Sequence, residues 1–257
     1  MAEPLIIPLR PVLIFIVVLA RVGGLVTFAP FWSHQAAPAR VRAVLALVLA
    51  LVLAPAVAPQ LGTPPADLIP LAVVVAGELL VGCALGLVGR LVFSGLEVAA
   101  QVLGFQMGFA LAATIDPATR AQTTALGTIA QMFGLVIFLG ADGHHWLLAA
   151  TVKSFQTTAP GSVSPALAAL LLRLSADALA VGVALAAPAI VTLLAVEFAL
   201  AVAGRAAPQL QVMIVGFPIK IAAGLWLTGA SLYFLPGAVR QVFAGMRASL
   251  ARVLGAL

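Results

Sequence analysis

Long runs of apolar residues, almost free of charge, constrain this chain more than any other feature of its sequence. Each main run approaches or exceeds the ~20 residues that a membrane-spanning helix needs. The runs are residues 12–31, 41–58, 68–93, 176–203 and 212–235, with shorter ones at 125–139 and 144–155. Because apolar residues are continuous and do not alternate with polar ones, helices are favoured over a closed barrel.

The composition excludes a water-soluble protein. Only 8% of the residues are charged and 63% are hydrophobic, whereas a soluble domain has about 25% charged residues. We therefore predict an all-α, polytopic membrane protein with about six long apolar helices, folded as one domain over residues 1–257. The net charge of +5 is spread thinly, which indicates membrane topology and lacks the basic cluster of a nucleic-acid site.

The most informative stretch is residues 97–117, EVAAQVLGFQMGFALAATIDP. At helical spacing, Glu97, Gln101, Gly104 and Gly108 share one face, and the last two form a G-x-x-x-G pair that allows another helix to approach closely. The bulky residues Phe105, Met107 and Phe109 stand on other faces. Such a segment could pack between partners or block a passage, and Asp116-Pro117 is expected to end any helix here.

Several charges lie inside or beside the apolar runs, where they are costly unless they face protein or water. They are Arg21, Glu78, Arg90, Glu97, Glu197 and Lys220. Glu78 shares a helix face with Gly82, Gly86 and Gly89. A proton relay and hydrogen bonding between packed helices both fit this pattern, and packing is favoured because spacing alone brings no ionisable groups together. Replacing Glu78 or Glu97 with glutamine is therefore expected to preserve most activity.

Prolines and arginines mark the end of the chain. Pro208 and Pro218 are expected to break or kink the last apolar runs. The tail, residues 236–257, spaces three arginines among apolar residues, which indicates an amphipathic helix at a membrane surface. The positive-inside bias places this tail in the cytoplasm.

No catalytic or cofactor motif is visible in the sequence. It contains no nucleotide-binding loop, nucleophile triad or paired catalytic carboxylates, so we predict a protein that is not an enzyme and has no cofactor. Three histidines and the single Cys83 are too few for a convincing metal site. The His144-His145 pair is expected to lie at a turn.

Four stretches, in order along the chain, closely resemble the FliR family of type III export-gate proteins. They are residues 104–117 (GFQMGFALAATIDP), 138–155 (FLGADGHHWLLAATVKSF), 204–211 (GRAAPQLQ) and 216–220 (GFPIK). Arg21, followed by Pro38, Arg40 and Arg42, also fits the family. Each motif is modest alone, but the ordered set is specific and covers nearly the whole chain.

The resemblance implies a non-enzymatic subunit of the flagellar export gate in the bacterial inner membrane and flagellar basal body. In that family one FliR copy joins FliP and FliQ in a right-handed helical assembly, in which several helices form kinked hairpins on the periplasmic side. FlhB wraps the cytoplasmic entrance, FlhA lies nearby, and unfolded flagellar subunits pass through the centre. The flagellar branch of the family resembles this chain more than the virulence branch does.

The resemblance also implies that residues 104–117 plug the closed channel, with Phe105, Met107 and Phe109 as blocking side chains. Two other functions remain open from the residues alone. A stand-alone secondary transporter would couple protons through Glu78, Glu97 and Glu197, and a passive scaffold would tolerate substitution of the three bulky residues.

Overall fold

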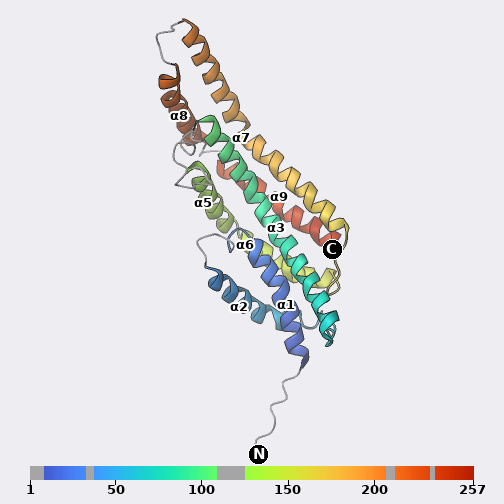
Figure 1. The fold of residues 1–257 in the computed structure, drawn as a ribbon. Coiled ribbons are helices and arrows are strands. Elements are labelled where there is room, and N and C mark those ends of the chain that lie inside the picture. The colour runs from blue at the N-terminus through green and yellow to red at the C-terminus, as the bar shows by residue number, and fades with distance from the viewer. Residues whose placement is uncertain (1–8, 33–37, 109–124, 207–211, 232–234) are drawn as a thin grey trace, which may run out of the picture. The chain divides into compact units, whose positions relative to one another are not determined.

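The computed structural model describes residues 9–32, 38–108, 125–206, 212–231 and 235–257. All regular elements among these residues are α-helices (Figure 1). The eight helices of this described part are α1 (Leu9–Phe28), α2 (Ala39–Val57), α3 (Leu68–Gln106), α5 (Ala125–Gly140), α6 (Gly143–Thr157), α7 (Ala166–Ala206), α8 (Val212–Ser231) and α9 (Leu235–Ala256). The predicted all-α class is thereby confirmed.

Four helices, α1, α2, α3 and α7, are long and apolar enough to cross a membrane, or five spans if the bent pair α5 and α6 counts as one. These four or five spans among the described residues support a polytopic membrane protein and are fewer than the six expected. The difference is the run at 212–235, because its helix α8 (Val212–Ser231) is not among these candidate spans. The central stretch adds no span up to Gln106, since α3 continues from the third apolar run through Glu97 to that residue.

Two helices are much longer than a bilayer requires. At 1.5 Å per residue, the 39 residues of α3 and the 41 residues of α7 correspond to about 58 and 62 Å. The hydrocarbon core of a bilayer is about 30 Å thick. A single crossing therefore leaves roughly half of either helix outside the hydrocarbon.

The chain forms two compact units, each assembled from distant parts of the sequence. The first unit contains residues 1–91, 142–174 and 244–257, and the second contains residues 92–141 and 175–243. Helices α3, α7 and α9 each contribute residues to both. The division is therefore not a cut of the chain into two consecutive domains.

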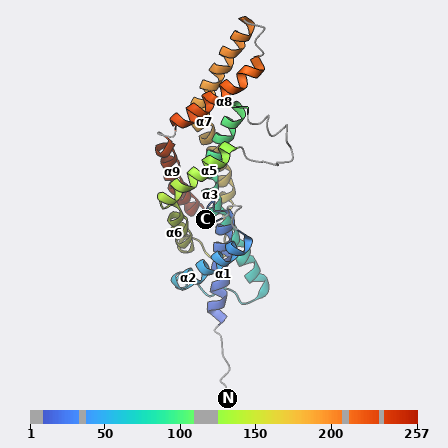
Figure 2. The same ribbon diagram turned by 90° about the vertical axis from the view of Figure 1, so that its left-hand side faces the viewer.

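In the first unit, α1 packs against α2 and both contact α6 (Figures 1 and 2). The buried stripe of α1 includes Val17, Val18, Val22 and Leu25. Glycines allow α1 to approach α3 closely, since a Cβ at Gly24 would lie 2.5 Å from the backbone oxygen of Leu79. Close backbone approach over small residues is the usual packing mode of membrane helices.

The second unit has an aromatic core. The rings of Phe93, Phe138 and Phe243 lie with centroids 5.3–5.5 Å apart, and all three side chains are at most 3% exposed. Close packing also joins α3 to α7, because a Cβ at Gly182 would lie 2.6 Å from the backbone oxygen of Gly95.

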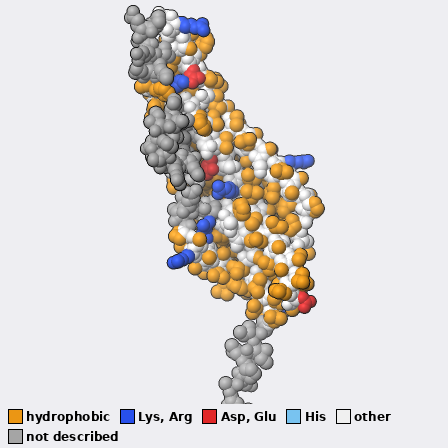
Figure 3. Space-filling view, in the orientation of Figure 1, with side chains coloured by type: hydrophobic (Ala, Val, Ile, Leu, Met, Phe, Trp, Pro, Cys, Tyr) orange, Lys and Arg blue, Asp and Glu red, His pale blue; other side chains and the backbone are white. Residues whose placement is uncertain are grey.

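Much of the surface is apolar. Figure 3 shows a face covered largely by hydrophobic side chains, with only scattered charges. Residues such as Leu51 on α2 and Phe198 on α7 are 67% and 73% exposed. Exposed apolar area of this kind marks a lipid-facing or partner-facing surface.

Helix α9 contains the predicted tail. Its Phe243, Met246, Leu250 and Val253 are buried, whereas Arg240, Arg247 and Arg252 are exposed. The guanidinium of Arg247 lies 5.2 Å from the centre of the Trp146 ring on α6, which is within cation–π range.

Candidate functional site

A buried ion pair between Arg21 on α1 and Glu78 on α3 lies within the first unit. Both residues are 0% exposed. Arg21 Nε donates to Glu78 Oε2 at 2.6 Å, and Nη2 donates to Oε1 at 2.8 Å. This is the bidentate geometry in which arginine binds a carboxylate most strongly.

Residues of α6 and of the loop that follows it complete the network. Arg21 Nη1 donates to Ser154 Oγ at 2.8 Å, and that hydroxyl donates to the carbonyl of Thr151 at 2.6 Å. The Phe155 ring covers the guanidinium, with its centre 3.9 Å from Cζ. The backbone N–H of Gly161 donates to Glu78 Oε1 at 3.1 Å. Four parts of the chain therefore meet at one neutral pair.

Glycines position the two charges. A side chain at Gly82 would overlap the backbone of Arg21, and a Cβ at Gly86 would lie 2.7 Å from the carbonyl oxygen of Leu25. Near Glu78, a Cβ at Gly77 would lie 2.5 Å from the oxygen of Gly161, which has a positive φ of 78°. Gly82 and Gly86 of the predicted glycine face therefore lie directly against α1, and a Cβ at Gly89 would lie 3.1 Å from Pro30, whereas Gly77, which packs on the 158–165 loop, was not predicted.

The arrangement stabilises packing more readily than it relays protons. A buried charge needs a partner and satisfied hydrogen-bonding groups, and here both Glu78 oxygens accept hydrogen bonds. Removing one member of such a pair costs about 3–5 kcal/mol because the other charge is left uncompensated. The pair thus holds α1, α3 and α6 in one arrangement.

The second unit contains two further polar pairs. Gln131 Nε2 on α5 donates to Glu97 Oε1 on α3 at 3.0 Å. Lys220 on α8 forms an ion pair with Glu197 on α7, and their side chains are 23% and 39% exposed. Gln101 is half-buried. Each predicted intramembrane carboxylate therefore has its own local partner.

The central stretch leaves regular helix at Gln106. Gly104 is buried, Phe105 is 66% exposed and Met107 is 0% exposed. Gly108 has a positive φ of 85°, a conformation that favours glycine. Phe109 and residues 110–117, which include the Asp116-Pro117 stop, lie outside the described residues.

Met107 packs into a small cluster of the second unit. It lies with the buried Leu193 of α7, beside Leu103 and Ala223. Gly224 of α8 makes room for it, since a Cβ there would lie 2.6 Å from the methionine sulfur. The structure therefore places Met107 in a core and leaves Phe105 facing outward.

Pro208 and Pro218 were expected to break or kink the last apolar runs. Pro218 lies inside α8, which continues through it. The neighbouring Phe217 ring lies over Gly108, where a Cβ would meet it at 2.6 Å. Pro208 lies outside the described residues.

Among the described residues, Asp142, His144 and His145 are the group able to offer three metal ligands, with ligand atoms within 4.8 Å of one another. His145 Nδ1 lies 3.3 Å from Asp142 Oδ1, and both side chains are largely exposed. The group stands at the start of α6, where the helix dipole disfavours a cation. The histidine pair was expected to lie at a turn, but the turn is at residues 141–142, and His144 and His145 lie in the first turn of α6, which begins at Gly143.

Sequence reasoning did not find the partners of the predicted charges. Spacing within one helix carries no information about contacts between helices far apart in the chain. Ser154 lies one helical turn from Ala150 and two turns from Leu147, and this shared face with apolar residues was the one signal of its burial. The missed partners of the charges are Ser154, Phe155, Gly161 and Gln131. Phe217 and Gly224 are the missed neighbours of Gly108 and Met107.

Comparison with known proteins identifies the family. Residues 12–246 match the model of the bacterial export proteins, family 1. The chain belongs to the FliR family of bacterial export proteins. It is 37% identical over 218 residues to the flagellar biosynthetic protein FliR of Caulobacter vibrioides, covering 84% of this chain and 86% of that protein.

Two other relatives mark the range of the family. The flagellar biosynthetic protein FliR of Escherichia coli is 31% identical over 246 residues, which cover 93% of this chain and 92% of that protein. The Yop proteins translocation protein T of Yersinia pestis is 28% identical over 160 residues, which cover 61% of each chain. The chain is therefore a multi-span membrane protein of the flagellar export family, whose members are not known as enzymes.

Proposed function

We propose that this FliR-family chain is a non-enzymatic subunit of the flagellar type III export gate in the bacterial inner membrane. With FliP and FliQ homologues it forms the channel through which unfolded flagellar subunits leave the cell, and FlhB and FlhA homologues lie at its cytoplasmic entrance. The observation that carries the proposal is the similarity to a flagellar FliR over 93% of the chain.

The proposed assembly is the right-handed helical complex of the family. It contains one copy of this chain, which folds as a single FliR-like domain. The continuity of α3, α7 and α9 between the two compact units supports one domain. The exposed apolar residues of α7 supply area for partner subunits, and the lengths of α3 and α7 fit helices that extend beyond the bilayer on the periplasmic side. We also propose a sixth membrane span and, as the family resemblance implies, kinks in several helical hairpins.

We further propose that residues 104–117 close the resting channel. Phe105 is exposed and free to line a constriction, and apolar constrictions exclude ions by dewetting. Met107 has a different part from that expected, since its packing against Leu193 anchors the segment. Gly108 supplies the backbone freedom at the point where the segment leaves α3.

A proton-coupled transporter is the alternative from another class. It needs carboxylates that are free to bind and release protons, whereas Glu78, Glu97 and Glu197 are each hydrogen-bonded or ion-paired. A subunit of a virulence secretion system is the other alternative, supported by the Yersinia relative at lower identity and coverage.

The test is purification of the affinity-tagged full-length chain in mild detergent, followed by mass measurement of the intact complex. The proposal expects one copy of this chain with several copies of FliP and FliQ homologues, and loss of motility when the gene is deleted. Deleting the chain while motility and flagellar export persist would contradict it. A chain that purifies alone and transports a small solute in vesicles would favour the transporter.

A further inference from the structure

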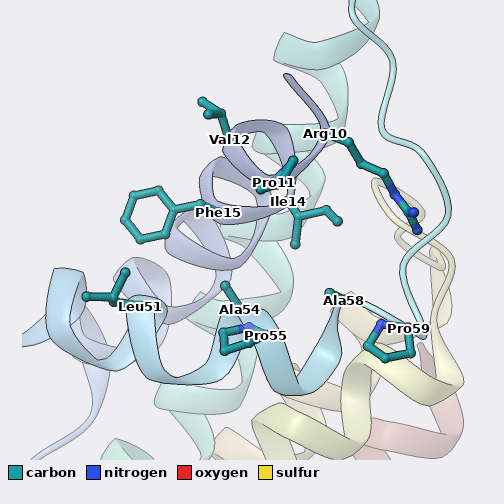
Figure 4. A pocket seen from close by; sticks show the side chains of 10 residues that line it. All are labelled: Arg10, Pro11, Val12, Ile14, Phe15, Leu51, Ala54, Pro55, Ala58 and Pro59. Atoms are coloured by element: carbon teal, nitrogen blue, oxygen red, sulfur yellow. The ribbon is translucent and has the colours of Figure 1, made fainter. Parts of the chain in front are cut away.

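A pocket of about 710 Å³ lies between α1 and α2 in the first unit. This volume falls within the range of 300–1,000 Å³ that is typical of small-ligand sites. Its lining comes from the start of α1 and from the end of α2 with the two residues that follow, and consists of Arg10, Pro11, Val12, Ile14, Phe15, Leu51, Ala54, Pro55, Ala58 and Pro59 (Figure 4).

The pocket is apolar except at one end. Nine of its ten lining side chains are hydrocarbon, and its three prolines have no backbone N–H to donate. A peptide or a polar metabolite would bring hydrogen-bonding groups that such walls cannot satisfy, at a cost in free energy. An alkyl chain brings none, so the walls select for hydrocarbon.

Arg10 supplies a cation at the one polar end of the pocket. In Figure 4 its side chain extends beside Ala58 and Pro59, whereas Phe15 and Leu51 lie toward the opposite end of the pocket. No carboxylate of the described residues forms an ion pair with Arg10, and the residue is exposed. Among the described residues no acid therefore competes for the guanidinium, and phosphate is one of the anions that arginine binds bidentately.

We propose that the pocket binds one anionic phospholipid, with an acyl chain between α1 and α2 and its phosphate on Arg10. Both walls are helices long and apolar enough to cross a membrane, so an acyl chain is the hydrocarbon that such walls are expected to meet. The pocket is distant in sequence from residues 104–117. Lipid binding there does not depend on the proposed export function. The lipid contributes apolar contacts to α2, of which only Ala46, Ala50, Ala54 and Val57 are buried.

The test uses the full chain with its copurifying partners. Delipidated complex is mixed with palmitoyl-oleoyl-phosphatidylglycerol or with the phosphatidylcholine of the same chains, and bound lipid is counted by native mass spectrometry. Wild type should bind one phosphatidylglycerol per copy of this chain, about fivefold more tightly than phosphatidylcholine, which is the usual effect of one basic residue on an anionic lipid.

Three variants separate the parts of the site. Arg10→Gln should abolish the preference between the two lipids, and Arg40→Gln, an exposed arginine at the other end of α2, should leave it unchanged. Ala58→Trp fills the pocket and should weaken both lipids. Equal binding of the two lipids to wild type, or an unchanged preference in Arg10→Gln, would overturn the proposal. An Ala58→Cys variant tests what occupies the pocket, because bound lipid should shield the introduced thiol from crosslinking reagents. A crosslink from this cysteine to a partner chain would also overturn the proposal. If Ala58→Trp does not fold, Arg10→Gln still decides the outcome because Arg10 is exposed.

Discussion

Replacing Glu78 with glutamine should destabilise this chain strongly, although the sequence alone suggested that the amide would be tolerated. The glutamine side chain keeps the volume of Glu78 but carries no charge. Arg21 is 0% exposed and donates two hydrogen bonds to Glu78, at 2.6 and 2.8 Å. The amide oxygen of glutamine could accept only one of them, its NH2 group would face an arginine N–H, and the buried guanidinium would have no counter-charge. The expected cost is about 3–5 kcal/mol, or roughly 10²–10⁴ in the folding equilibrium.

The assay is thermal unfolding of the purified complex, followed by fluorescence-detected gel filtration. For a chain of this size each kcal/mol lowers the midpoint by about 2–4 °C, so Glu78→Gln should lower it by roughly 6–20 °C. Glu97→Gln is the matched control, because that carboxylate is half-buried and accepts one hydrogen bond from Gln131 at 3.0 Å. Its expected cost is about 1 kcal/mol.

A double replacement tests whether charge is the cause. Arg21→Met with Glu78→Leu removes both charges and keeps the volume, which is often nearly neutral for buried pairs. Ser154 still donates to the carbonyl of Thr151, so only the Gly161 N–H loses its acceptor. The double variant should therefore be more stable than either single one. Equal stability of Glu78→Gln and Glu97→Gln would refute the reasoning.

Three more outcomes are expected. Gly82→Val should prevent accumulation of the chain in membranes because its side chain would collide with the backbone of α1, whereas Gly23→Ala, with nothing within 4 Å of its Cβ, should accumulate normally; immunoblotting of membrane fractions measures both. Met107→Ala should cost about 2–5 kcal/mol through the cavity it leaves, while Phe105→Ala should keep the melting midpoint and let cells take up a normally excluded dye; a dye-tight Phe105→Ala complex would place the seal elsewhere. A periplasm-dependent reporter fused after Leu257 should be silent, and strong activity would reverse the proposed orientation.

Most helices could be predicted from the sequence because the length of each apolar run largely sets where a helix begins and ends. The run at 41–58 predicted α2 (Ala39–Val57) to within two residues at either end. The run at 12–31 predicted α1 three residues too far along the chain, since α1 starts at Leu9 and ends at Phe28. The junction after Phe93 was harder, because Ser94 and Gly95 are weak helix breakers in an apolar setting. Helix α3 therefore passes through them.

The site around Arg21 and Glu78 could be predicted from the sequence only in part. The four-residue spacing of Glu78, Gly82 and Gly86 revealed a glycine face on one helix, because that periodicity is local. Its partner Arg21 stands 57 residues away in sequence, and Ser154 stands 133 residues from Arg21. Contacts over such separations depend on tertiary packing. The same limit applies to Met107, whose burial depends on Leu193 and Gly224.

The separation of Arg21 from Glu78 has a consequence for biosynthesis. Ribosomes add about 5–20 residues per second, so the 57 residues between them take roughly 3–11 s to synthesise. During that interval α1 reaches the insertion machinery with a charge whose insertion costs about 2.5–3.5 kcal/mol near the bilayer centre. The apolar residues around Arg21 favour insertion, and the arginine opposes it. We therefore expect Arg21 to be without its counter-charge until α3 has been synthesised, so the order of synthesis becomes part of how this chain reaches its fold.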